Sequence, residues 1–211
     1  MKLFYAPGAC SLGIHVTLRE VGAPFEAMRV DLRKGEQFGG ALEAANPKAK
    51  VPTLVRDDGS VLTEYPAIAW WLAAANPGAG LMPEGVEAQA RAMEATDYVV
   101  STMHMQGFSR IFRPGNFSPD EAQHGAVKVR GTEIFDKGLA LMDRRLDGRE
   151  WLAGEGRGAY SFADPALFYV SYWRAERLKG DLPPNVARHY AAMKARLAVR
   201  AALKAEGLDV A

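Results

Sequence analysis

The sequence has little cysteine, little net charge and no long apolar runs. Cys10 is the only cysteine among 211 residues, which excludes an internal disulfide framework and is typical of a reducing compartment. Lys and Arg number 26 against 25 for Asp and Glu, so neither nucleic acid nor a membrane surface is an expected partner. No apolar run is long enough to span a membrane, and the N-terminus lacks the apolar segment of a signal peptide. We therefore expect a soluble cytoplasmic protein.

Several catalytic motifs are also missing. The residue three places after Cys10 is Gly13 rather than a second cysteine, so a disulfide formed by Cys10 needs an outside thiol such as glutathione. The chain has no G-x-S-x-G motif, P-loop or dinucleotide-binding glycine pattern, and four scattered histidines with one cysteine do not make a metal site. These absences argue against a serine hydrolase, a nucleotide-binding enzyme and a metal centre.

The first forty residues predict a strand, a helix and a second strand. Lys2 to Ala6 is a short aromatic-rich segment that stops at Pro7-Gly8, a pair that turns the chain. The next segment alternates like a strand at Leu12, Ile14, Val16 and Leu18. We favour a helix from Cys10 or Ser11, capped by Ser11, because Gly22 and Pro24 form a helix stop. Phe25 to Leu32 then predicts a second strand, parallel to the first.

The remainder of residues 1–77 predicts a short helix, a hairpin and another helix. Gly40 to Ala45 forms the short helix, and Asp57-Asp58-Gly59 joins strands at 53–55 and 60–63. A proline at the entrance of a strand, here Pro52, is tolerated because no ladder donor is lost. The second helix begins at Glu64 or Tyr65. The N-terminal part is therefore of α/β class.

A Gly- and Pro-rich linker at 78–85 leads to a helical region at 86–211. The first long helix is predicted to bury one face that includes His104, with spacing of four and three residues. A second is predicted from a cap at Ser118 to about Leu146. Ser161 and Asp164 form a capping box for a helix that is apolar on nearly every side. The predicted face of the first helix comprises Val86, Ala90, Met93, Asp97, Val100 and His104, and the core candidates of the second are Ile134, Leu141 and Leu146.

Cys10 is the residue best placed for chemistry. At the start of a helix a thiol faces unpaired backbone N–H groups and the positive end of the helix dipole, which favour the thiolate. We therefore expect its pKa to lie below the ordinary value of about 8.5. The alternative is an inert cysteine packed as a small hydrophobe, because free cysteine is often buried.

With these residues in place, the chain resembles the glutathione S-transferases, most closely the bacterial beta class. The resemblance covers nearly the whole chain and implies a thioredoxin-like N-terminal domain, an all-helical C-terminal domain and a homodimer with one glutathione per subunit. The residues that carry it are Tyr5, Pro7-Gly8-Ala9-Cys10-Ser11-Leu12, Asn46-Pro47-Lys48, Val51-Pro52, Leu62-Thr63-Glu64, His104 and Ser161-Phe162-Ala163-Asp164.

The resemblance also implies a set of site residues. The catalytic ones are Cys10, His104, Tyr5 and Ser11. Those expected to bind glutathione are Lys34 at the glycine carboxylate, Val51 and Pro52 at the cysteinyl backbone, and Glu64 and Tyr65 at the γ-glutamyl end. The candidates for a pocket that binds an apolar electrophile are Phe108, Phe112, Phe117 and Trp173, each of which is equally compatible with core packing.

Three residues depart from the family pattern. Tyr65 replaces a small residue, commonly Ser, and the hydroxyl that Ser supplies to the γ-glutamyl carboxylate is lost. Asp97 stands where the beta class usually has Asn, and Met105 where Lys is common. An acid near a bound thiolate raises the free energy of the complex unless a cation compensates.

Three functions are consistent with the sequence. The leading one is a transferase that activates glutathione for addition to small apolar electrophiles. The second is a glutathione-dependent thiol-disulfide oxidoreductase or peroxidase, in which Cys10 forms a mixed disulfide. The third is a non-catalytic protein that uses the same fold to bind apolar ligands.

Overall fold

The computed structural model describes residues 1–208, and the last residues of the predicted helical region, 209–211, lie outside that range. Its N-terminal part is built on a four-stranded sheet with the order β2-β1-β3-β4. The strands are β1 (Lys2–Tyr5), β2 (Glu26–Arg29), β3 (Thr53–Val55) and β4 (Val61–Thr63). The first two are parallel, and β3 is antiparallel to both of its neighbours. The strand-helix-strand unit and the hairpin are thus confirmed.

The second strand is shorter than predicted because a turn at Asp31 ends it. The Asp31 carboxylate accepts a hydrogen bond from the backbone N–H of Arg33, and Glu36 accepts one from the N–H of Asp31. Local side-chain bonds of this kind compete with the sheet ladder.

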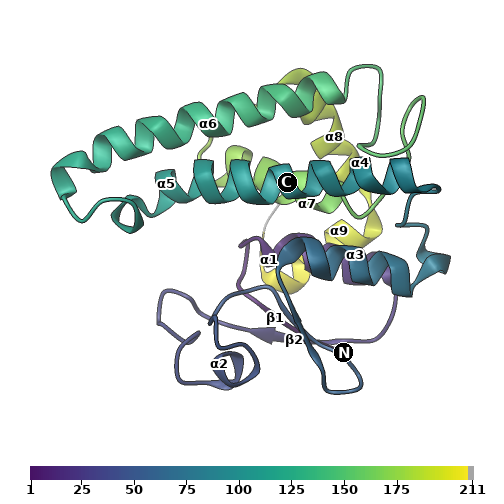
Figure 1. The fold of residues 1–211 in the computed structure, drawn as a ribbon, viewed down its shortest axis with the longest axis horizontal. Coiled ribbons are helices and arrows are strands. Elements are labelled where there is room, and N and C mark those ends of the chain that lie inside the picture. Colours follow the sequence, from purple (N-terminus) through teal and green to yellow (C-terminus); the bar gives the residue numbers. More distant parts are fainter. Residues whose placement is uncertain (209–211) are drawn as a thin grey trace.

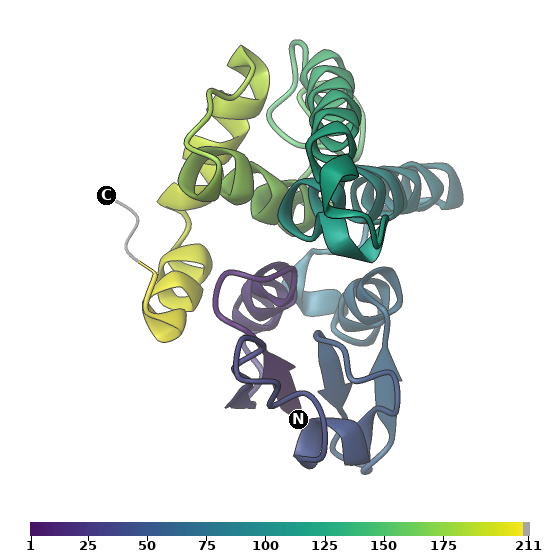
Figure 2. The same ribbon diagram turned by 90° about the vertical axis from the view of Figure 1, so that its left-hand side faces the viewer.

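Helix α1 (Ser11–Val21) resolves the ambiguous alternation in favour of a helix. Residues 11–18 are all buried, because α1 lies between the sheet and the helical domain (Figure 2). A segment buried on every side shows no clean helical period. The helix ends at Gly22, whose φ of 74° is left-handed and suits glycine. Helices α2 (Ala41–Ala45) and α3 (Tyr65–Ala75) complete this domain.

The second domain is helical in the described residues, apart from an isolated β-bridge between Ala153 and Ala159. A 3₁₀ turn, η1 (Pro77–Ala79), precedes α4 (Val86–Asp97), which continues as the π-helical segment η2 (Tyr98–Phe108) and then α5 (Ser109–Phe112). This long rod runs beside α6 (His124–Arg145) (Figure 1). Behind them lie α7 (Asp164–Tyr172), the π-helical η5 (Trp173–Arg177), α8 (Pro184–Ala195) and α9 (Leu197–Glu206). Short 3₁₀ turns η3 (Pro114–Asn116) and η4 (Glu121–Gln123) join α5 to α6.

The buried face predicted for the first long helix is wrong by one position. Val86 is 83% exposed and Asp97 is exposed as well. Small residues set the true face, since an alanine gives a weak apolar signal in the sequence yet packs closely against a neighbouring helix. The buried side chains are Ala92, Ala95, Thr96, Val99 and Met103.

The start and core of α6 also differ from prediction. Asp120, not Ser118, accepts the N–H of Ala122 and caps η4, the turn that leads into α6. Among the predicted core residues Leu146 is buried, whereas Ile134 and Leu141 are only half-buried. The core of this helix is formed by Phe135, Leu139 and Met142.

The α7 helix is buried along its whole length, as predicted. The Asp164 carboxylate accepts the N–H of Ser161 at 2.8 Å, which confirms half of the capping box. The other half differs, because Ser161 Oγ accepts from the N–H of Ala163 instead of Asp164. Asp164 also accepts from the N–H of Leu152 and contacts His189 Nε2, both at 3.0 Å. This one carboxylate therefore ties three segments of the helical domain to the start of α7.

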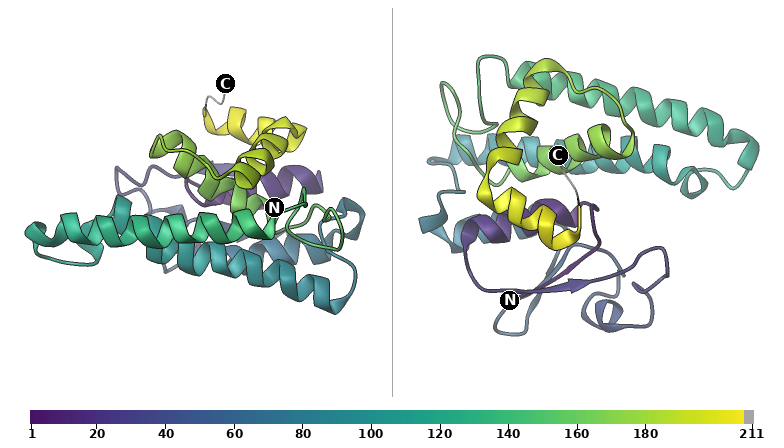
Figure 3. Two further views of the ribbon diagram at one scale, coloured as in Figure 1. Left: turned by 90° about the horizontal axis from the view of Figure 1, so that it is seen from above. Right: turned by 180° about the vertical axis from the view of Figure 1, so that it is seen from behind.

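The last helix returns to the first domain. Helix α9 packs against α1, which Figure 3 shows from behind the view of Figure 1. The site described below lies where α1, α7, η5 and α9 meet. Among the described residues no helix is both long and apolar enough to cross a membrane.

Candidate functional site

The turn from Pro7 to Cys10 joins β1 to α1 and holds the only thiol. Gly8 takes a left-handed φ of 64°, and Cys10 occupies the N-cap position of α1. Ser11 is the first helical residue and does not cap the helix, contrary to prediction. Its hydroxyl instead accepts from the N–H of Ala6 at 3.1 Å, and it can donate to the carbonyl of the same residue at 3.3 Å. Ser11 thereby fastens both ends of the turn.

Residues of the helical domain bind the backbone of the same turn. Trp173 Nε1 donates to the Gly8 carbonyl at 2.8 Å, and Arg177 donates to the Pro7 carbonyl at 3.1 Å. The Gly8 N–H donates to Glu206 of α9 at 2.7 Å. A Cβ atom at Gly8 would lie 2.6 Å from the guanidinium at the flexible end of Arg177, and the left-handed φ of 64° is what favours glycine here.

The Glu206 carboxylate is buried and also lies 2.9 Å from His15 Nδ1. Sequence reasoning missed this residue, because α9 has a weak pattern and lies almost two hundred residues from the turn. The only signal was that Glu206 is the one acid in an Ala-rich helix. Removing one partner from a buried charged cluster is strongly destabilising.

Cys10 is half-buried, and its Sγ donates to the Val51 carbonyl at 3.4 Å. Burial raises the pKa of the Cys10 thiol to about 12, although the backbone N–H groups at the helix start act in the opposite direction. The expected low pKa is therefore wrong for the protein without glutathione, since desolvation of the thiolate outweighs the helix N-terminus. Cys10 is a neutral hydrogen-bond donor at neutral pH.

His104 lies on η2, and its ring is 4.7 Å from the Trp173 ring. Burial and the nearby Lys50 ammonium lower the pKa of His104 to about 4. The imidazole is therefore neutral at neutral pH, with one donor nitrogen and one acceptor nitrogen. The Tyr169 hydroxyl of α7 lies 3.5 Å from its Nδ1. Trp173 thus connects His104 to the turn that carries Cys10.

The predicted glutathione-binding residues lie on the first domain. Val51 and Pro52 are joined by a cis peptide bond. Glu64 takes a left-handed φ of 69° at the start of α3, and its carboxylate pairs with Lys48 at 2.6 Å. Lys34 is largely exposed and lies 3.9 Å from Asp31. The Lys48–Glu64 and Lys34–Asp31 pairs therefore place charged groups of both signs on the surface of this domain.

The side chain of Tyr65 is buried rather than exposed beside Glu64. Its ring lies 5.3 Å from the Tyr169 ring. The Tyr65 hydroxyl would be 2.3 Å from a Cβ atom at Gly13, so the ring fills a notch that only glycine leaves open. The bulk of Tyr65 therefore packs between the domains.

A stack of aromatic rings runs outward from Trp173. Phe108 stacks on Trp173 at 4.1 Å and on Phe112 at 5.5 Å, with interplanar angles of 22° and 15°. Phe108 and Trp173 are buried, whereas Phe112 is 52% exposed. Phe117 is partly exposed and lies under the Arg110 guanidinium at 4.3 Å. The exposed end of the stack offers a flat apolar surface.

Tyr5 is set into the core of the first domain. Its ring lies 5.3 Å from the His15 ring, and burial raises the pKa of its phenol. The structure therefore shows Tyr5 behind the Pro7–Cys10 turn, next to the residue that Glu206 binds.

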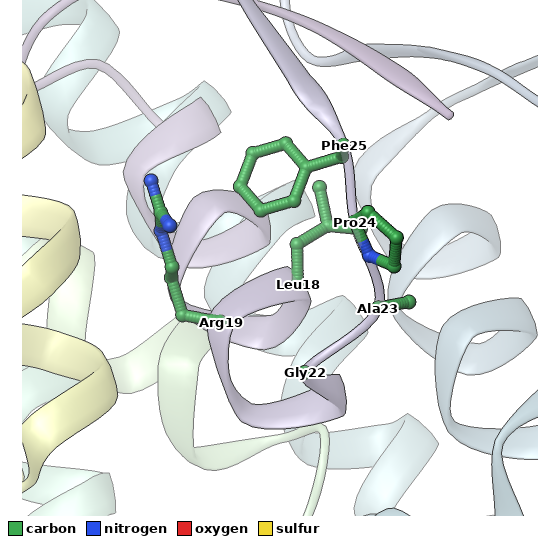
Figure 4. Close-up of a pocket in the computed structure, with 6 residues that line it drawn as sticks. All are labelled: Leu18, Arg19, Gly22, Ala23, Pro24 and Phe25. Atoms are coloured by element: carbon green, nitrogen blue, oxygen red, sulfur yellow. The ribbon is translucent and has the colours of Figure 1, made fainter.

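A shallow pocket of about 300 Å³ lies at the other end of α1 from Cys10. Figure 4 shows Leu18, Arg19 and Phe25 around it, and the Arg19 guanidinium lies 4.9 Å from the centre of the Phe25 ring. None of the predicted site residues lines it.

Comparison with known proteins agrees with this geometry. Residues 8–75 match the family model described as glutathione S-transferase, N-terminal domain. The chain is 37% identical over 211 residues to the glutathione S-transferase GstA of Escherichia coli O157:H7, covering 99% of this chain and 100% of that protein.

Solved structures give the same result. A sphingomonad glutathione S-transferase complexed with glutathione is 38% identical, with a TM-score of 0.84, and the match covers 99% of this chain and 100% of that one. The bacterial beta class glutathione S-transferase of Sphingomonas chungbukensis is 37% identical, with a TM-score of 0.85 and the same coverage. On the fold, the Pro7–Cys10 turn and these full-length similarities together, the chain belongs to the glutathione S-transferase family.

Proposed function

We propose that this protein activates the thiol of glutathione and adds it to small apolar electrophiles. One observation carries the proposal: the Cys10 thiol and the neutral His104 imidazole are uncharged donors from different domains, and Trp173 links them by packing on the His104 ring and donating to the turn that carries Cys10. Uncharged donors next to a helix N-terminus stabilise a bound anion, here the thiolate of glutathione.

Glutathione would lie along the first domain. The backbone of Val51, a half-buried residue, can pair with its cysteinyl part, and the Glu64 carboxylate can bind the γ-glutamyl ammonium. The N–H of Tyr65, at the first position of α3, can bind the γ-glutamyl carboxylate as other helix N-termini bind anions. We assign Lys34 to the glycine carboxylate. In this division residues 1–77 bind glutathione, 78–85 form the linker, and 86–211 contribute the electrophile pocket.

Lys50 is a further candidate that sequence reasoning missed. Its positive charge acts on His104, and its own carbonyl accepts hydrogen bonds from Asn46 and Thr53, which fix the backbone next to Val51. We propose that Lys50 supplies the cation that Met105 does not provide. Lys50 directly precedes Val51, a predicted glutathione-binding residue, and this position could have identified it from the sequence.

The reaction follows from these assignments. The thiol of bound glutathione releases its proton to solvent, and the thiolate accepts hydrogen bonds from Cys10 Sγ and His104. The sulfur then attacks a carbon of the electrophile, forming a carbon–sulfur bond, and an aromatic halide loses its halide ion. The exposed face of Phe112, with Phe108 and Trp173 behind it, holds the apolar part of the electrophile.

The neutral thiol favours this function over disulfide exchange. An oxidoreductase acting through Cys10 needs the thiolate as nucleophile, and burial opposes that form. Cys10→Ala should therefore retain appreciable conjugation of a model aromatic halide and lose any disulfide reductase activity. Near-complete loss of both activities would instead support covalent chemistry at Cys10.

The remaining alternative is a non-catalytic binding protein. Adsorption to immobilised glutathione together with conjugation by the wild type would exclude it. A mass measurement of the eluted protein reports whether Cys10 carries a mixed disulfide. Retention on the column without turnover of any electrophile would favour the binding protein.

We further propose a homodimer in a reducing compartment such as the cytoplasm. Trp70 on α3 is 44% exposed and Val61 on the contacting strand β4 is 38% exposed. Apolar side chains exposed on neighbouring elements are typical of an interface between copies. In this arrangement the first domain of one subunit contacts the helical domain of the other.

A further inference from the structure

Tyr169 packs against His104 and contacts its imidazole through the hydroxyl. The tyrosine is on α7, is fully buried, and has its hydroxyl 3.5 Å from His104 Nδ1. The two rings meet edge to face, with centroids 5.9 Å apart and an interplanar angle of 81°. Trp173 packs on both rings, at 4.7 Å from His104 and 4.9 Å from Tyr169.

The direction of the hydrogen bond can be assigned from the chemistry of the two groups. Burial raises the pKa of the Tyr169 phenol well above its ordinary value of 10.0, so the hydroxyl keeps its proton. A buried hydroxyl proton is stabilised by an acceptor, and among the described residues the hydrogen-bonding atom placed at this hydroxyl is His104 Nδ1. Because the imidazole is neutral, an accepting Nδ1 places the ring proton on Nε2.

We propose that Tyr169 is a positioning residue that holds His104 in the tautomer with its proton on Nε2. In this tautomer Nε2 is a donor for the sulfur of glutathione. The opposite tautomer would put a lone pair on Nε2 and leave the Tyr169 proton without an acceptor. The inference rests on the proposed role of His104 at the glutathione sulfur.

The length of the Tyr169 contact agrees with a site that tightens on binding. A separation of 3.5 Å is long for a hydrogen bond, and catalytic hydrogen bonds are often long before the substrate is bound. The π-helical turn that carries His104 is a departure from α geometry of the kind found at functional sites. Rings of Trp173 and Tyr169 limit how far the imidazole can rotate.

The tautomer can be measured directly in the 211-residue protein labelled with ¹⁵N-histidine. A long-range ¹H–¹⁵N correlation spectrum separates the two tautomers, and His104→Gln identifies the His104 signals by their loss. We expect the Nε2–H tautomer in the wild type and a mixture of both in Tyr169→Phe, which keeps the ring and removes the hydroxyl. In the same variant kcat for conjugation should fall about tenfold, with KM for glutathione nearly unchanged.

Ser171→Ala is the matched control. Ser171 is buried on the same helix, and its hydroxyl has no hydrogen-bond partner among the described residues. We expect this variant to keep the wild-type tautomer and kcat. An Nδ1–H tautomer in the wild type, an unchanged tautomer in Tyr169→Phe, or an equal loss of kcat in Ser171→Ala would each overturn the inference. Full turnover by His104→Gln would overturn the role of His104 itself, whatever its tautomer.

Discussion

Raising the pH of the native protein from about 6 to about 10.5 should increase the reactivity of Cys10 continuously, without a plateau. The thiolate is the form that reacts with an alkylating reagent, so the rate of alkylation follows the fraction of thiolate. Cys10 is the only cysteine. The mass of the intact protein therefore reports this one site.

The structure sets the size of the effect. Burial raises the pKa of Cys10 to about 12, against the opposing backbone N–H groups of Ser11 and Cys10 itself. A raised pKa means that the neutral thiol persists to higher pH. A pKa that is higher by about three lowers the fraction of thiolate at neutral pH roughly a thousandfold, compared with an ordinary cysteine. Because the Cys10 thiol donates to the Val51 carbonyl, ionisation also removes one hydrogen bond.

The assay is the rate of iodoacetamide alkylation measured by mass spectrometry across this pH range. We expect about a tenfold increase per pH unit up to about pH 10 for the native protein, and a midpoint near 8.5 for the chain unfolded in guanidinium. A double variant, Cys10→Ser with Ser101→Cys, carries its thiol at an exposed position and should titrate like the unfolded chain. A plateau below pH 9 in the native protein would refute the dominance of burial and restore Cys10 as a candidate nucleophile.

Three other predictions concern binding, packing and assembly. Glu64→Ala should weaken glutathione binding by about 1–3 kcal/mol through loss of a charge-assisted bond; isothermal titration that shows no change, as expected for the exposed control Glu133→Ala, would remove Glu64 from the site. Gly131→Ala should lower the free energy of unfolding by about 1–3 kcal/mol, because its Cβ would lie 2.8 Å from a carbonyl of the facing π-helix. Gly125→Ala on the same helix, where the Cβ meets nothing within 4 Å, should be neutral or stabilising in denaturant titrations, and the reverse order would contradict the packing argument. Trp70→Glu should convert a dimer to a monomer in light scattering, whereas a monomeric wild type would remove the proposed interface.

Local patterns determined much of the fold. Pro7-Gly8 and Gly22 mark the ends of β1 and α1, because a left-handed backbone strongly favours glycine. The hairpin, the capping role of Asp164 and the fully apolar α7 were also predicted, since each depends on neighbours within a few residues. The family resemblance added the expectation that His104 acts beside Cys10, which no local pattern predicts.

Tertiary structure decided the properties that depend on distant neighbours. The ionisation of Cys10 is an example, because a sequence shows that a thiol begins a helix but not how much protein surrounds it. The hydrogen bonds of Gly8 with Glu206 and Trp173 join residues more than 160 positions apart. Neither α9 nor η5 carries a sequence motif that predicts these bonds. Burial and long-range hydrogen bonds arise only when the two domains pack, so the electrostatics of the site are a property of the assembled fold.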